Sequence, residues 1–219
     1  MADVERPELR SEDHRHLTRS LRLRSGDRFT ASDGAGSWRV CRLGAGRDGR
    51  AEPDGPVVRV EAPHPNLTVG FALIKGGRPE LVVQKLTELG VDAMVPFVAD
   101  RSVVRWDPDR AVRHTERLRR VVREAAMQSR QVRIPAVGDL AGFAELAALS
   151  GAIRADRDGE PPSLDHPVVL IGPEGGWSDS ERRRLGAMRL SWSVLRSETA
   201  AITAGALLTA LRAGLTSRA

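Results

Sequence analysis

The sequence predicts a two-part α/β protein, in which a parallel sheet covered by helices follows a small β-rich domain. Residues 1–62 hold short strand-like segments between Gly- and Asp-rich turns, whereas strand and helix patterns alternate from residue 67 onward. Two later segments, 171–177 and 195–200, each follow an apolar run and precede a helical pattern. Because open α/β sheets bind ligands where their strands end, these two segments form the predicted site.

The first predicted domain covers residues 1–62. Its predicted elements are a short basic helix at 11–23 and three strands at 27–31, 37–43 and 56–61, with turns at 33–36 and 44–55. Short strands separated by Gly-rich turns, with little helix, predict a small β-barrel.

One glycine-rich loop of this domain resembles a nucleotide-binding motif. Residues 44–49 match the fingerprint G-x-G-x-x-G and follow a predicted strand. That motif binds a pyrophosphate where it opens a helix, and here Pro53 and Pro56 follow with another strand. We therefore interpret the loop as a hairpin connection.

Residues 67–219 form the second predicted domain, after a linker at 62–66 that two prolines stiffen. Its predicted strands lie at 67–74, 91–98, 167–170 and 191–194, and its predicted helices at 78–89, 109–130, 140–149 and 199–211. The last two strands are the apolar runs before the two site segments. Ser178 with Glu181 predicts a capping box after the first segment, and Thr199 predicts the N-cap after the second.

Composition limits the class of protein. With 41% hydrophobic and 29% charged residues, the 219-residue chain is typical of a soluble globular protein. No apolar run approaches the roughly 18 residues that a membrane span needs, and the first residues lack a secretory signal pattern, so we expect a cytoplasmic protein. Cys41 is the single cysteine, and His14 and His16 have no further partner in sequence, so we expect neither a disulfide nor a metal site.

The charge of the chain favours a polyanionic partner. The formal net charge is +5 and the pI is about 10.7. Only two of the 34 basic residues are lysines, and such an arginine bias also arises from genome base composition. Clustering is the stronger indication, and two clusters stand out: Arg15, Arg19, Arg22, Arg24 and Arg28, and Arg117, Arg119, Arg120, Arg123, Arg130 and Arg133.

The two site segments resemble a known pair of loops. They have the sequences Ile-Gly-Pro-Glu-Gly-Gly-Trp at 171–177 and Leu-Arg-Ser-Glu-Thr-Ala at 195–200. In this order they resemble the cofactor-binding loops of the SPOUT methyltransferases, specifically of the RsmE family, which methylates N3 of a uridine in 16S ribosomal RNA. Segments 16–27, 80–90, 100–102 and 124–129 also resemble that family, which extends the likeness over nearly the whole chain.

The last of these segments departs from the family pattern. Met127 replaces an acidic residue, and Arg130 with Gln131 stands where Gly-Arg is usual. The departure leaves a catalytic role for residues 127–131 open.

The resemblance implies a SPOUT-type parallel sheet with a C-terminal trefoil knot, a PUA-like N-terminal barrel, and a homodimer. It also implies S-adenosyl-L-methionine as the cofactor and 16S rRNA of the small ribosomal subunit as the partner. The apolar side chains of the final helix could be buried in the dimer interface or could pack on the sheet of their own subunit. They are Ala200, Ile202, Ala204, Leu207, Leu208 and Leu211. Two other functions remain open: a non-catalytic RNA-binding protein of ribosome assembly, and a SPOUT methyltransferase acting on tRNA.

The chemistry of uridine N3 suggests which side chains act. N3 holds a proton at neutral pH, so methylation benefits from a base or from a cation that stabilises the resulting anion. We expect Glu198 to be the base, Arg196 the stabilising cation, and Gln128 a hydrogen-bond partner of the uracil edge. Glu198 also suits a helix N-terminus without any catalytic role, and Gln128 also suits a helix end.

The remaining site residues follow from the same resemblance. Backbone groups and glycines can hold the uncharged adenine, so the predicted cofactor-binding residues are Leu170, Ile171, Gly172, Glu174, Gly175, Gly176, Leu195, Thr199 and Ala200. The predicted RNA-binding residues are His16, Arg19, Arg22, Arg24, Lys75 and Lys85. Lys85 alternatively pairs with Glu88, three residues on. Trp177 and Trp192 flank the loops, and tryptophans there are more often core residues than base-stacking platforms.

Overall fold

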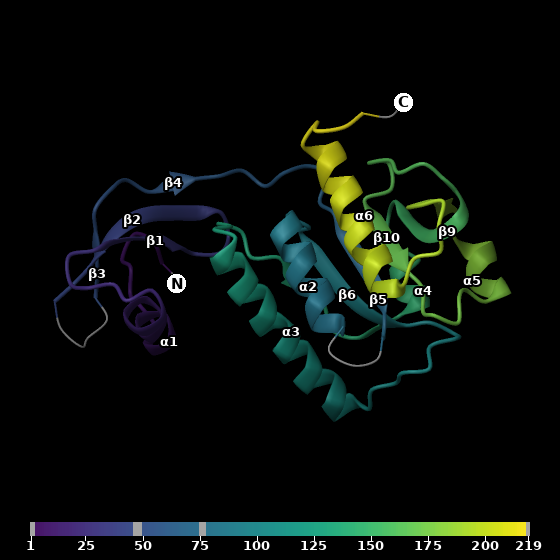
Figure 1. Cartoon of the computed structure of the whole chain (residues 1–219), viewed down its shortest axis with the longest axis horizontal. Coiled ribbons are helices and arrows are strands. Elements are labelled where there is room, and N and C mark those ends of the chain that lie inside the picture. The colour runs from purple at the N-terminus through teal and green to yellow at the C-terminus, as the bar shows by residue number, and fades with distance from the viewer. Residues whose placement is uncertain (1–2, 46–49, 75–77, 218–219) are drawn as a thin grey trace. The chain divides into compact units, whose positions relative to one another are not determined.

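A computed structural model describes residues 3–45, 50–74 and 78–217. The chain folds into two compact units, one of residues 1–62 with 130–134 and one of residues 63–129 with 135–219. Figure 1 follows the chain through both units. Among the described residues, no helix combines the length and apolarity that crossing a membrane requires.

The first unit contains a four-stranded antiparallel sheet. Its strands are β1 Arg28–Ser32, β2 Ser37–Leu43, β3 Ala51–Pro53 and β4 Val58–Arg59, and β2 pairs with the other three. The predicted helix at 11–23 is shorter than expected: α1 Ser11–Arg15 continues into one turn of π-helix, His16–Ser20. Ala31, Cys41 and Ala51 form the small core of the sheet, and burial raises the pKa of the Cys41 thiol.

The hairpin interpretation of the glycine-rich loop is confirmed. Leu43 pairs with Ala51 across β2 and β3, and the Gly44 amide donates to the Arg50 carbonyl at 2.9 Å. β3 lies inside the stretch that the sequence predicted as a turn, and residues 46–49 fall outside the described ranges.

Residues 130–134 pack with the first unit although they follow the long helix of the second. The Gly36 amide donates to the Val132 carbonyl at 3.0 Å, and the Ile134 amide to the Gly34 carbonyl at 2.9 Å. Arg130 has a left-handed φ of 57°, which ends the helix two residues before the predicted limit. Sequence periodicity did not predict this return to the first unit.

The second unit is built on a parallel sheet of seven strands (Figure 1). The spatial order is β11-β9-β10-β5-β6-β7, with β8 also pairing β6, and every pairing is parallel. The bounds are β5 Thr68–Ala72, β6 Ala93–Val98, β7 Ala136–Val137, β8 Ala141–Gly142, β9 Ala152–Glu160, β10 Val168–Ile171 and β11 Ala187–Met188. All strands therefore end at one carboxyl edge.

Helices cover both faces of this sheet. α2 Arg78–Leu89, α3 Pro108–Gln128 and α6 Ser197–Arg212 pack on one face, where Val169 and Ile171 of β10 enter the main core. Val168 and Leu170 point to the other face, into a smaller core with Trp177 and the one-turn helix α4 Phe143–Leu146. The alternation along β10 thus fills two cores.

Several sequence predictions for this unit are wrong. No strand occupies 191–194, where Trp192 and Val194 are 83% and 76% exposed; the strand is the shorter β11, just before it. The predicted helix at 140–149 is β8 followed by the single turn of α4, and β9 was missed because its sequence is largely charged. Thr199 is not the cap of α6, which begins at Ser197 after Arg196, and no side chain caps it.

Candidate functional site

The first site loop joins β10 to α5 Asp179–Arg184 and wraps around Trp177. Trp177 is 3% exposed, stacks on Phe97 with ring centroids 6.2 Å apart, and donates its Nε1–H to the Ala155 carbonyl at 2.9 Å. A Cβ on Gly172 would lie 2.8 Å from the Trp177 ring. The loop therefore needs glycine at 172 to close over the ring, and Trp177 is a core residue.

A second turn braces this loop from β6. The buried Glu181 carboxylate accepts the Ser178 amide at 2.8 Å, which completes the predicted capping box, and the Asp100 amide at 3.0 Å. The Asp100 carboxylate accepts the hydroxyls of Ser178 at 2.5 Å and Ser180 at 3.0 Å. These two hydrogen bonds lower the pKa of Asp100 below its ordinary value of 3.8. The turn at Asp100-Arg101-Ser102, one of the segments that resemble the family, thus holds α5 and the loop in place.

Bare backbone faces open space at the middle of the loop. Gly176 has a left-handed φ of +70°, and nothing lies within 4 Å of where its Cβ would be. Gly175 lies closer to protein, since a Cβ there would be 3.1 Å from the Arg101 carbonyl oxygen. Within this loop, a ligand can therefore approach the backbone most closely at Gly176.

The second site segment leads from β11 into α6 and meets the first loop. The Ser197 hydroxyl donates to the Gly172 carbonyl at 3.1 Å. Arg196 is exposed just before the helix, and Glu198 lies in its first turn. The structure thus brings the two predicted cofactor segments together, from Leu170 and Ile171 at the end of β10 to Leu195, Thr199 and Ala200.

Arg78 is a site residue that the sequence analysis missed. Its Nε lies 3.6 Å from Glu198 Oε1, and its Nη1 lies 3.8 Å from Glu174 Oε1. The Glu198 side chain is only 14% exposed, and its Oε2 is buried without a hydrogen-bond partner among the described residues. One cation between two carboxylates leaves a net negative charge. The only local signal for Arg78 is its place at the start of a predicted helix, directly after the strand that ends at the same sheet edge.

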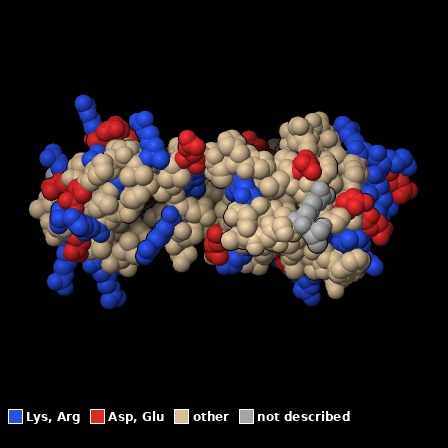
Figure 2. All heavy atoms as spheres, turned by 90° about the horizontal axis from the view of Figure 1, so that it is seen from above, with Lys and Arg blue, Asp and Glu red and all other residues tan. Residues whose placement is uncertain are grey.

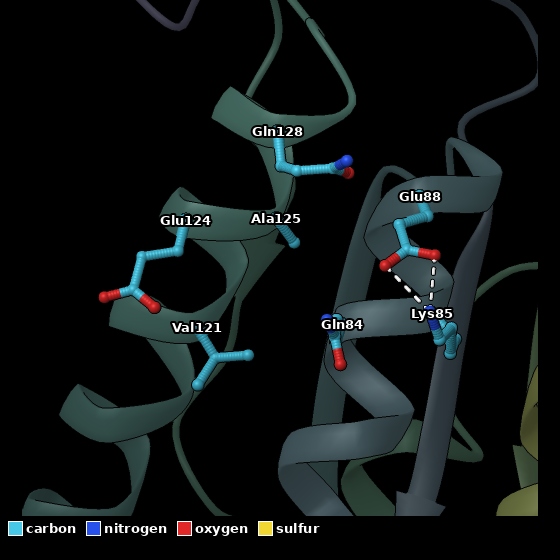
Figure 3. A pocket seen from close by; sticks show the side chains of 7 residues that line it. All are labelled: Gln84, Lys85, Glu88, Val121, Glu124, Ala125 and Gln128. Atoms are coloured by element: carbon cyan, nitrogen blue, oxygen red, sulfur yellow. Dashed lines mark hydrogen bonds and ion pairs between the residues drawn. The ribbon is translucent and has the colours of Figure 1, made fainter. Parts of the chain in front are cut away.

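Gln128 and Lys85 lie elsewhere, in a groove of about 460 Å³ between α2 and α3 (Figure 3). Lys85 Nζ donates to both Glu88 carboxylate oxygens, at 2.9 and 2.7 Å, so the alternative of a local ion pair is confirmed. Gln128 points toward Glu88, at the far end of α2 from Arg78 (Figure 3). Ten helical residues span about 15 Å, so Gln128 and the Arg78–Glu198 pair lie at opposite ends of α2.

The other predicted RNA-binding residues lie in the first unit. His16 and Arg19 belong to the π-helical turn, and Arg19, Arg22 and Arg24 are exposed. Figure 2 shows Lys and Arg side chains standing out from the surface with Asp and Glu among them. Lys75 lies outside the described residues.

Part of each arginine cluster has a structural role. Arg28 pairs with Asp54 at 2.5 Å, which lowers the pKa of that carboxyl. Arg117 pairs with Glu80 at 3.0 Å, and Arg119 binds the Val137 carbonyl at 3.1 Å. Cluster size in the sequence therefore overstated the charge available to a nucleic acid.

Comparisons with known proteins identify the family of this chain. The RNA methyltransferase domain family matches residues 61–209, and the RNA methyltransferase PUA domain family matches residues 9–50. A ribosomal RNA small subunit methyltransferase E from Mycobacterium bovis is 34% identical over 212 residues, which cover 86% of this chain and 80% of that protein. The protein of the same name from Synechocystis is 32% identical over 218 residues, 90% of this chain and 70% of the relative.

Solved structures show the same architecture. The Neisseria gonorrhoeae ribosomal RNA small subunit methyltransferase E, bound to S-adenosyl methionine, superposes with a TM-score of 0.78 at 29% identity, over 93% of this chain and 90% of that one. A putative Legionella pneumophila methyltransferase in complex with the same cofactor gives a TM-score of 0.79 at 26% identity, over 93% and 91%. With a family match over most of its length, this chain belongs to the RsmE family of SPOUT RNA methyltransferases, the ribosomal RNA small subunit methyltransferase E proteins.

Proposed function

We propose that this protein transfers a methyl group from S-adenosyl-L-methionine to N3 of a uridine in 16S rRNA. The observation that carries the proposal is the meeting of two loops at one sheet edge, with the Ser197 hydroxyl 3.1 Å from the Gly172 carbonyl oxygen and Glu198 beside them. Membership of the RsmE family supports the reaction, and relatives named as small subunit rRNA methyltransferases support the substrate.

The residues at this edge fit the cofactor. The open, left-handed backbone at Gly176 suits an uncharged adenine that needs close approach to main-chain groups. The net negative cluster of Glu174, Glu198 and Arg78 suits a cationic sulfonium and an amino group. When bound, the cofactor supplies an electrophilic methyl group. The proposed binding residues are Leu170, Ile171, Gly172, Glu174, Gly175, Gly176, Leu195, Thr199 and Ala200.

Two side chains are proposed to act on the acceptor. Glu198 takes the N3 proton, since its buried Oε2 has a free lone pair for it. Arg196, exposed at the start of α6, stabilises the negative charge that then spreads over the uracil ring. Arg78 is a positioning residue that orients the Glu198 carboxylate. Gln128, at the end of α3 and in the same groove as Glu88, is proposed to contact RNA.

The first unit is proposed to bind the RNA. Residues 1–62 form the proposed PUA-like domain, with His16, Arg19, Arg22 and Arg24 on the RNA side, and residues 67–219 the catalytic domain. Lys75 is proposed to add a contact from the catalytic domain, and Lys85, although paired with Glu88, keeps 41% of its side chain exposed for a second contact. The partner is the small ribosomal subunit, and a cytoplasmic location follows from that substrate.

A homodimer is proposed from the outer side of α6. Ala204 and Leu208 pack in the core of their own subunit, whereas Ile202 and Leu207 remain partly exposed and suit a second copy. The trefoil knot implied by the family remains a prediction.

Mass spectrometry of ribosomal RNA tests the function. RNA from cells that lack the protein should lose one 3-methyluridine, and wild-type protein should restore it. Arg196→Ala should restore little, with turnover reduced while RNA affinity is kept. An unchanged rRNA profile would refute the proposal, and a modification lost from tRNA would identify the tRNA enzyme instead.

A further inference from the structure

Trp192 is an unusually exposed tryptophan beside the proposed active site. Its side chain is 83% exposed, whereas Trp177 of the neighbouring loop is 3% exposed. It lies on residues 189–196, the segment that connects β11 to Arg196 and the start of α6. A large exposed aromatic ring at a functional edge indicates a binding surface.

Arg189 covers one face of the exposed Trp192 ring. The Arg189 guanidinium carbon lies 4.1 Å from the centroid of the Trp192 ring, which is cation–π geometry. Since the side chain is 83% exposed, the face away from Arg189 is open to solvent. A flat ring backed by a positive charge offers a stacking surface with electrostatic attraction for a phosphate chain.

We propose that Trp192, backed by Arg189, stacks on an unpaired base of the RNA substrate next to the methylated uridine. This inference rests on the proposed function, since it names a contact of the same RNA. Four residues of extended chain reach at most about 14 Å, so a base on Trp192 lies near one held by Arg196. Proteins recognise single-stranded RNA by stacking splayed bases on aromatic side chains.

The surroundings favour a base over a second protein surface. Ser191 and Ser193 flank the ring, and Arg189 and Arg196 are the charged residues of the segment. A stable protein interface buries about 800 Å² on each partner, and the two exposed apolar side chains of this segment, Trp192 and Val194, supply much less than that. The apolar surface suited to a second copy is the outer side of α6.

Binding of short RNA strands to the full-length protein tests the stacking. The probes are a single-stranded oligoadenylate and an abasic strand of equal length, followed by fluorescence anisotropy and tryptophan emission. We expect Trp192→Ala to weaken oligoadenylate binding roughly tenfold and Trp192→Phe to keep most of it. Oligoadenylate should quench wild-type emission, the abasic strand should not, and Trp192→Ala should abolish the quenching. Leu215→Ala is the matched control, since Leu215 is 81% exposed beyond α6.

The outcomes separate this inference from the proposed function. If wild-type protein methylates rRNA and Trp192→Ala matches it in affinity and KM, the stacking role is refuted and the function stands. If quenching depends on Trp192 but no rRNA is methylated, the proposed function is refuted, and with it the position of the stacked base next to a methylated uridine. A Trp192→Ala protein that turns monomeric with unchanged RNA binding would overturn the inference in favour of an interface between copies.

Discussion

The two segments that meet at the carboxyl edge are built in different ways. The loop after β10 follows four buried strand residues, wraps the buried Trp177 ring, and is braced by Glu181 and Asp100. The segment before α6 leaves a two-residue strand and exposes Trp192 and Val194 to solvent. A preformed loop suits a small cofactor, and an exposed segment suits a polymer that arrives from solvent.

The difference has a physical origin in burial. The first loop exchanges water for contacts with the Trp177 ring and for a hydrogen bond from the Ser178 amide to the buried Glu181 carboxylate, and these contacts favour a single conformation. The second has few apolar contacts to fix it, and regions of this kind open at low free-energy cost. We therefore expect substitutions in the first loop to change stability and cofactor binding, and substitutions around the second to change turnover or RNA binding.

The largest effect is expected from Gly172→Ala. The new Cβ would lie 2.8 Å from the Trp177 ring, which is packed and hydrogen-bonded and has no room to retreat. Overpacking of this kind destabilises by about 1–3 kcal/mol, and we expect S-adenosylmethionine binding to be lost as the loop shifts. Thermal denaturation and calorimetry measure the two effects. In the control Gly186→Ala the Cβ meets Ile153 at an ordinary 3.9 Å, and equal behaviour of the two variants would contradict the prediction.

Gly176→Asn should separate cofactor binding from stability. Asparagine tolerates the left-handed φ of +70°, and its side chain would project into open space, so the apo protein should melt almost as wild type does. Calorimetry should show cofactor affinity at least roughly tenfold lower, about 1.4 kcal/mol, because the backbone is no longer bare. Gly176→Val should lower both quantities, since a β-branched residue is strained at this φ. Unchanged affinity in Gly176→Asn would place the cofactor elsewhere.

Arg78→Gln should affect turnover more than binding. The guanidinium is 3.6 Å from Glu198 Oε1 and partly exposed, so its loss removes a modest interaction of about 1 kcal/mol or less. Turnover should fall by up to roughly fivefold while cofactor affinity changes little. Single-turnover kinetics measure this step, and Arg78→Lys should restore part of the rate. A cofactor affinity that falls as far as turnover would assign Arg78 to binding.

The contrast between the segments also explains what the sequence could predict. The first loop was predictable because local patterns determine it: an apolar run, glycines, and the Ser178–Glu181 capping box. The strand at 191–194 was wrongly predicted because apolar side chains there face solvent, and no local pattern reports that exposure.

Long-range contacts were beyond the reach of sequence patterns. The Arg78 pair with Glu198 and the hydrogen bond from Ser197 to Gly172 join residues far apart in the chain. The charged strand β9 is held by its neighbours in the sheet, so its own composition did not predict it. The family resemblance supplied the predicted site residues, and the structure is needed to separate Gln128 from Glu198.

The smallest effect is expected from Asp100 as the pH falls. Hydrogen bonds from Ser178 and Ser180 lower the pKa of Asp100. At a pH above its ordinary pKa of 3.8, ionised Asp100 therefore stabilises the contact between its turn and the first site loop. That contribution is lost as the pH falls through the lowered pKa of the folded state. Asp100→Asn should therefore melt slightly below wild type at neutral pH, and the gap should close below pH 3.8. Melting curves of both proteins across this range check the prediction, and a gap that persists in acid would show that the carboxylate charge does not hold the brace.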